Sequence, residues 1–78
     1  MKRERKSEIP EVVKELGIKI KDVIDSNQMK QREVAHDAGL DVENLRKYLK
    51  GSQEMKIGTL FKIAQALKIH PSELIKDL

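Results

Sequence analysis

One stretch of the sequence, residues 42–50, carries side chains that can hydrogen-bond to nucleic acid. At intervals of three and four residues it holds Glu43, Arg46, Lys47 and Lys50. This spacing places all four on one face of a helix, opposite Leu45 and Tyr48. Arginine and lysine can donate to guanine O6 and N7, and glutamate can accept from cytosine N4. The segment therefore has the chemistry to read base pairs.

Residues for covalent catalysis or metal binding are sparse. The chain has no cysteine, which excludes a disulfide framework, a cysteine-based zinc site and a thiol nucleophile. His36 and His70 are the only histidines and lie far apart in the sequence. The serines and the single threonine sit in no nucleophile motif, and there is no glycine-rich phosphate loop. We therefore expect no enzyme activity, no metal, no cofactor and no small-molecule ligand.

The length of 78 residues allows one domain, and 16 Lys+Arg against 13 Asp+Glu give a net charge of +3. The first residues are polar and contain four cations, Lys2, Arg3, Arg5 and Lys6. We expect a basic flexible tail over 1–9 and a folded domain over 10–78. No apolar run reaches the roughly 18–20 residues of a membrane span, and no signal-peptide core is present at the start. These features predict a cytoplasmic protein without membrane association.

Apolar spacing predicts an all-α fold of five short helices, because no segment alternates with the period of a strand. The first starts at Pro10, with Gly17 as a possible break. The others are expected at about 31–38, 41–50, 57–67 and from Pro71 onward. Gly39 suits a left-handed cap, and Asp41 suits the N-cap of the third helix.

The second and third helices are joined by only Gly39-Leu40-Asp41, which is too short for an antiparallel hairpin. Gly39 can adopt positive φ, Leu40 can fill the space between the helices, and Asp41 can start the next helix. This arrangement is typical of a helix-turn-helix, whose second helix can enter a major groove about 12 Å wide.

From Leu16 to Leu74 the chain resembles the phage-repressor/Cro (XRE-type) family of lambda-repressor-like helix-turn-helix DNA-binding domains. The opening of the family pattern is matched by Leu16, Gly17, Ile20 and Val23. Its central pattern is matched by Gln31, Val34, Ala35 and Gly39. Its closing helices are matched by Leu60, Ile63, Ala64, Leu67 and the run from Pro71 to Leu74.

The resemblance implies sequence-specific binding of double-stranded DNA by a small transcriptional regulator, with the helix at about 42–50 in the major groove. The residues expected to contact bases are Val42, Glu43, Arg46 and Lys47. The residues expected to contact phosphates are Lys30, Gln31, Asn44, Lys50 and Lys56. For the tail cations, contact with DNA and a solvated end both stay open.

The chain departs from the family pattern in two respects. Where the family often pairs an arginine with a glutamate, this chain has Ile24 and Leu49. Replacing an ion pair by two apolar groups is often neutral or stabilising, so we expect these side chains to touch in the core. Lys30 stands where the family usually has a serine or threonine N-cap, and lysine cannot accept the unpaired N–H groups there.

One recognition helix reads few base pairs, so a homodimer on two half-sites is expected. Phe61, Ile75 and Leu78 are candidates for its surface, although a place at the edge of the core explains them equally well. The rival function is a protein-interaction module on the same fold, antitoxin-like or an assembly subunit. It is supported by acidic groups near the groove-facing side, Asp37, Asp41 and Glu43.

Overall fold

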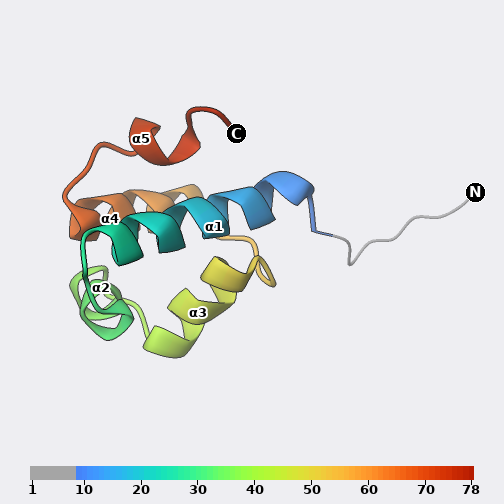
Figure 1. Ribbon diagram of the computed structural model, residues 1–78. Helices are drawn as coiled ribbons and strands as arrows, with labels where there is room; N and C mark the ends of the chain where they lie inside the picture. The colour runs from blue at the N-terminus through green and yellow to red at the C-terminus, as the bar shows by residue number, and fades with distance from the viewer. Residues whose placement is uncertain (1–8) are drawn as a thin grey trace, which may run out of the picture.

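The computed structural model describes residues 9–78, which form five α-helices and no strand. The helices are α1 (Glu11–Ser26), α2 (Gln31–Asp37), α3 (Val42–Lys50), α4 (Ile57–Leu67) and α5 (Ser72–Ile75) (Figure 1). This confirms the predicted all-α, five-helix fold. The expected tail cations, at positions 2 to 6, lie outside the described residues.

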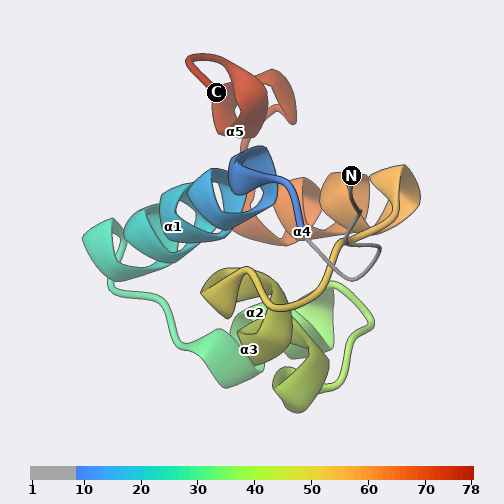
Figure 2. The same ribbon diagram turned by 90° about the vertical axis from the view of Figure 1, so that its right-hand side faces the viewer.

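The helices are arranged in three layers. In two views at right angles, α1 and α4 form the middle layer, α5 lies above it, and α2 and α3 lie below it (Figures 1 and 2). The helix-turn-helix therefore occupies the opposite side of the domain from α5. This leaves the α2–α3 pair accessible to a large partner.

Helix α1 runs without interruption through Gly17, so the break that the glycine suggested does not occur. The glycine is needed for a tertiary contact instead. A Cβ at this position would lie 2.5 Å from the carbonyl oxygen of Tyr48 and 2.7 Å from that of Leu49. The C-terminal end of α3 therefore packs directly against the backbone of α1.

The core is entirely apolar in the part of the chain that the structure describes, where no polar or charged side chain is buried. The largest fully buried side chains are Ile20, Ile24, Leu45, Ile63, Leu74 and Val34. Ile24 and Leu49 are both buried in the same cluster, as expected of two apolar groups replacing an ion pair, while their direct contact stays a prediction. Tyr48 also belongs to this core.

The turn between α2 and α3 follows the predicted chemistry in most respects. Gly39 has a φ of 72°, and the Leu40 N–H donates to the Ala35 carbonyl at 2.8 Å. Leu40 is half-buried against the core, so it fills the space between the two helices. Asp41 does precede α3, but its side chain makes no capping hydrogen bond, so the expected cap is wrong in that detail. The Asp41 carboxylate is exposed to solvent.

Helix α5 is short and is held from two sides. Leu74 is fully buried, and the Lys19 ammonium of α1 donates to the Lys76 carbonyl at 2.6 Å. At its start, the Ser72 N–H donates to His70 Nδ1 at 3.2 Å. His70 therefore accepts from one of the N–H groups that the first turn of α5 leaves unpaired.

Candidate nucleic-acid interface

Helix α3 has one exposed polar face and one buried apolar face. Its buried residues are Leu45, Tyr48 and Leu49. The exposed ones are Glu43, Asn44, Arg46, Lys47 and Lys50. All the polar residues that were expected to contact DNA from this helix are therefore accessible, with three cations against one carboxylate.

Val42 lies differently from the other expected base contacts. It is half-buried and packs against the core at the first turn of α3. Only part of its side chain is available to a thymine methyl group, so its expected role is limited to a contact through that exposed part.

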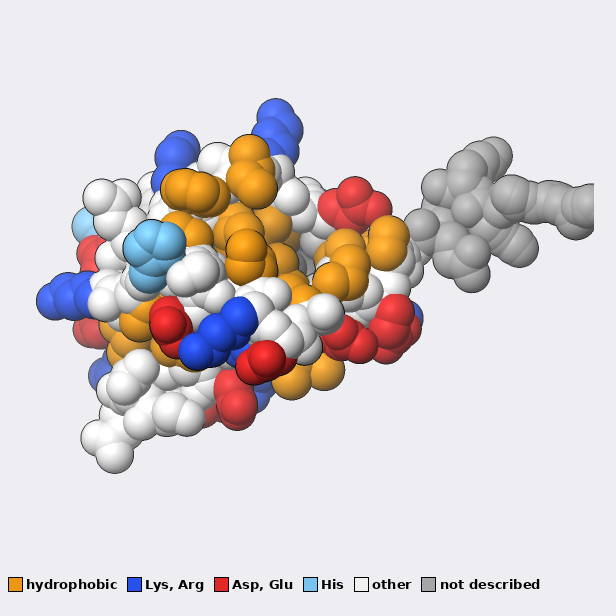
Figure 3. Space-filling model, turned by 90° about the horizontal axis from the view of Figure 1, so that it is seen from above, with side chains coloured by type: hydrophobic (Ala, Val, Ile, Leu, Met, Phe, Trp, Pro, Cys, Tyr) orange, Lys and Arg blue, Asp and Glu red, His pale blue; other side chains and the backbone are white. Residues whose placement is uncertain are grey.

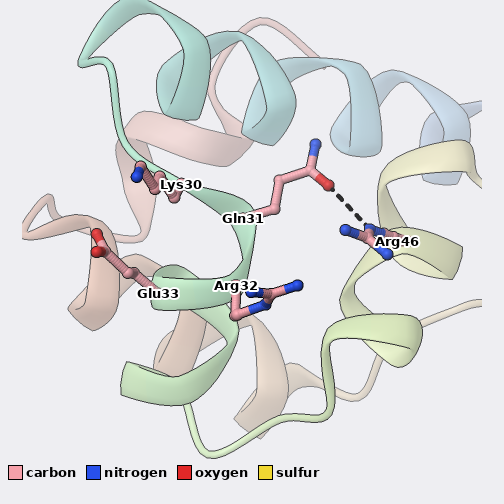
Figure 4. Close-up of a pocket in the computed structure, with 5 residues that line it drawn as sticks. All are labelled: Lys30, Gln31, Arg32, Glu33 and Arg46. Atoms are coloured by element: carbon pink, nitrogen blue, oxygen red, sulfur yellow. Dashed lines mark hydrogen bonds between the residues drawn. The ribbon is translucent and has the colours of Figure 1, made fainter.

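Arg46 is held by two neighbours on different helices. Its Nε donates to Gln31 Oε1 at 3.3 Å (Figure 4). Its Nη1 lies 3.4 Å from Glu43 Oε2. Because a guanidinium has donors only, Gln31 must present its amide oxygen to Arg46. The amide nitrogen of Gln31 is consequently left for another acceptor. The contact joins the expected phosphate-binding residue of α2 to an expected base-reading residue of α3.

The Gln31–Arg46 contact is shared by two surface hollows. The first is lined by Lys30, Gln31, Arg32, Glu33 and Arg46. The second is lined by Lys21, Gln31, Arg46, Leu49 and Lys50. The junction between α2 and α3 is therefore rich in cations, which favours an anionic partner.

Two of these cations were not predicted from the sequence. Arg32 is exposed in the first turn of α2, and its side chain extends toward Arg46 in Figure 4. Lys21 reaches the second hollow from α1, where it also pairs with Asp25 at 3.0 Å. The sequence could have indicated Arg32 as a site residue, because it follows Gln31 directly and precedes Val34, which is buried. Lys21 could not, because its approach depends on how α1 crosses α3.

The remaining expected phosphate contacts lie at helix starts. Lys30 and Lys56 immediately precede α2 and α4, and both are exposed. As predicted, Lys30 makes no side-chain capping bond. Lys30 lines the first hollow, whereas Lys56 lines neither hollow.

Acidic side chains also border the site. Glu33, Asp37 and Asp41 are exposed, and Asp37 lies 3.6 Å from His36 Nδ1.

Within residues 9–78, no three His, Cys, Asp or Glu side chains are grouped to hold a metal ion. The same described part contains no helix that is long and apolar enough to cross a membrane.

The family model of the Cro/C1-type HTH DNA-binding domain matches residues 8–77. The chain belongs to this family. Cro/C1-type domains are parts of DNA-binding regulators, which are generally not enzymes, so DNA binding in transcription regulation is the function class of this Cro/C1-type chain. This confirms the family that the sequence resembles.

Solved structures agree with this assignment of the Cro/C1-type chain. The restriction-modification controller protein C.AhdI from Aeromonas hydrophila is 25% identical, with a TM-score of 0.77 over 82% of this chain and 96% of that one. The clp gene regulator ClgR from Corynebacterium glutamicum has the same fold, with a TM-score of 0.80, 18% identity, and coverage of 86% and 71%. A comparison with curated protein sequences found no match.

Proposed function

We propose that this Cro/C1-type domain binds specific sequences of double-stranded DNA as a small transcriptional regulator, with α3 in the major groove. The observation that carries the proposal is the exposed polar face of α3, with Arg46, Lys47 and Lys50 on a helix whose other face is anchored in the core. A recognition helix needs this combination, because the base-reading side chains must be free while the helix itself is held rigidly.

Roles within the proposed interface follow from the chemistry of each side chain. Lys47 donates to guanine, Glu43 accepts from cytosine, and Val42 contacts a thymine methyl through its exposed part. Gln31, Asn44, Lys30, Lys50 and Lys56 contact phosphates, which position the domain without reading sequence. Since the proposed ligand is DNA, the proposed location is the cytoplasm.

The proposal includes a homodimer. Three exposed apolar side chains support it: Phe61 on α4 is 55% exposed, Ile75 on α5 47%, and Leu78 40%. Figure 3 shows hydrophobic side chains grouped on the face that carries α5. Two proteins of similar structure are a restriction-modification controller and a gene regulator, which is consistent with a role in controlling transcription.

The layers of the fold restrict how such a dimer can form. Because α5 and α3 lie on opposite sides of the middle layer, stacking two α5 faces would point the two α3 helices in opposite directions (Figures 1 and 2). Two half-sites on one duplex require both α3 helices on the same side. The two copies must therefore associate side by side. In such a dimer Phe61, which lies in the middle layer, contributes more to the interface than Ile75 and Leu78.

Selection from a pool of random-sequence duplexes at two salt concentrations tests the proposal. We expect one enriched sequence with two related half-sites, and an affinity that falls steeply as salt rises. No enriched sequence together with no salt dependence would refute DNA binding by this face. That outcome, combined with association through the apolar face, would favour the rival function as a protein-interaction module.

A further inference from the structure

We propose that Arg32 and Arg46 together form a clamp for a single DNA phosphate at the junction of α2 and α3, with Gln31 as the residue that positions Arg46. The inference rests on the proposed function and goes beyond it, because it adds Arg32 to the interface. It also assigns Arg46 a contact with a phosphate instead of a contact with a base.

The geometry of Arg46 is the first support. Its guanidinium is tied to Gln31 of α2 through Nε at 3.3 Å. To reach a base edge, Arg46 would have to leave this contact and turn away from α2. A phosphate at the junction can be reached while the contact is kept, because the remaining N–H groups of the guanidinium form a fork that matches phosphate oxygens.

The position of Arg32 is the second support. Arg32 and Arg46 line the same hollow, and Figure 4 shows the Arg32 guanidinium extending toward Arg46 beneath Gln31. Lys30 and Glu33 line the same hollow from the other side of the start of α2. In the part of the chain that the structure describes, no carboxylate lies within ion-pair distance of Arg32. Two guanidinium groups that border one hollow both attract an anion placed in it.

Gln31 completes the site. Its oxygen accepts from Arg46, and in Figure 4 its amide nitrogen points away from Arg32, so Gln31 acts on the clamp by holding Arg46 in place. Glu43 accepts from the other side of Arg46 at 3.4 Å and restrains the guanidinium. The phosphate contact expected of Gln31 itself therefore lies beside the clamp, on the side of Gln31 away from Arg32. Base reading is left to Lys47 and to the second carboxylate oxygen of Glu43, whose Oε2 accepts from Arg46.

Binding of the duplex enriched by selection tests this assignment with the variants Arg32→Gln, Arg46→Gln, Arg46→Lys and the Arg32→Gln/Arg46→Gln double variant. Lys62→Gln is the matched control, because Lys62 is an exposed cation on α4. Fluorescence anisotropy across a salt series gives the affinity and its salt slope, and a repeated selection gives the sequence preference. Circular dichroism checks that each variant is folded.

We expect each glutamine variant to weaken binding about tenfold at moderate salt, equally for the enriched duplex and for unrelated duplexes. The double variant should reduce the salt slope by about 0.9, which corresponds to one phosphate. Its loss of affinity should be smaller than the product of the single losses, because both side chains hold the same group. Arg46→Lys should restore part of the affinity, since it keeps the charge and loses the fork. Lys62→Gln should change neither the affinity nor the salt slope.

Three results would overturn the clamp. A changed preference at one base pair in Arg46→Gln, with an unaltered salt slope, would make Arg46 a base reader. An unaffected Arg32→Gln variant would remove Arg32 from the interface, and a slope reduced by about 1.8 in the double variant would indicate two separate phosphates. A failure of the proposed function can be distinguished from a failure of the clamp, because the unmodified protein would then enrich no sequence at all.

Discussion

Gly17 of α1 and Tyr48 of α3 meet backbone to backbone, so that a Cβ on Gly17 would lie 2.5 Å from the Tyr48 carbonyl oxygen. The Leu49 carbonyl oxygen is nearly as close, at 2.7 Å. This contact sets the distance between α1 and the recognition helix. A methyl group here would have to push α3 outward, because backbone atoms cannot rotate away as a flexible side chain can.

Gly17→Ala should therefore destabilise the domain by about 2 kcal/mol, even though alanine is the better helix former. Urea unfolding followed by circular dichroism measures this change. Gly58→Ala is the matched control, because Gly58 lies in the first turn of α4 and a Cβ there would meet nothing within 4 Å. It should stabilise the domain by about 0.5 to 1 kcal/mol. Equal effects of the two substitutions would contradict the close packing of α1 and α3.

The two glycines with positive φ should respond differently to substitution. Gly39 and Gly51 have φ values of 72° and 73°, but only Gly51 is crowded, since its Cβ would lie 2.8 Å from Lys14 Cα. We expect Gly39→Ala to cost about 1 kcal/mol, from the left-handed backbone alone. Gly51→Ala should cost about 3 kcal/mol, because it adds a clash with α1. Gly39→Asn should be milder than Gly39→Ala, since asparagine tolerates this conformation. Thermal unfolding of the three variants would show whether this order holds.

The contrast between these glycines shows what the sequence can and cannot predict. Gly39 ends one amphipathic segment and precedes another, so its left-handed cap follows from local pattern alone. The five helices and most of the core follow from apolar spacing in the same way. The requirement for glycine at position 17 arises from α3, about 30 residues further along the chain, and no local pattern contains it. Local spacing instead suggested a break in α1.

The same distinction applies to the candidate site. The exposed face of α3 follows from helical spacing, because Leu45 and Tyr48 fix which side is buried. The meeting of Gln31 with Arg46 joins residues fifteen positions apart and depends on the angle between α2 and α3. The hollow that Arg32 shares with Arg46 has the same origin. Local spacing predicts neither relationship, because both depend on how the helices are placed relative to each other.

Removal of the buried anchor of α5 should loosen the C-terminal segment. Leu74 is fully buried, so Leu74→Ala should lower the free energy of unfolding by about 2 to 4 kcal/mol. Ile75→Ala is a suitable control, because the neighbouring Ile75 is exposed and its truncation should change stability by less than about 0.5 kcal/mol. A similar loss in both variants would mean that α5 does not depend on this single anchor.

Lys47 and Lys50 should have separable effects on DNA binding, although both are exposed cations on α3. Lys47→Ala should relax the sequence preference at one base pair, with a loss of discrimination of about 1 to 3 kcal/mol. Lys50→Ala should weaken all duplexes alike and reduce the salt slope by about 0.9. Selection and salt titration of both variants test this difference. The same uniform effect in both would mean that the groove-facing side of α3 has been placed incorrectly.

Phe61 should be needed for association of two copies. Phe61→Glu puts a charge into the proposed side-by-side interface and should raise the dimer dissociation constant at least about a hundredfold, which sedimentation equilibrium can measure. Ile18→Glu is the matched control, since Ile18 is 65% exposed on α1 and is not one of the residues proposed for the interface. A dimer that persists in Phe61→Glu, or one that is lost equally in both variants, would exclude this interface.

The wholly apolar core has a consequence for how this protein could be altered. Because no polar or charged side chain is buried in residues 9–78, the polar groups that would meet a nucleic acid and the groups that hold the domain together are different sets, and only Val42 belongs to both. Positions 43, 46, 47 and 50 can therefore be randomised together with little risk to folding. The domain is thus a natural starting scaffold for libraries in which new DNA specificities are selected.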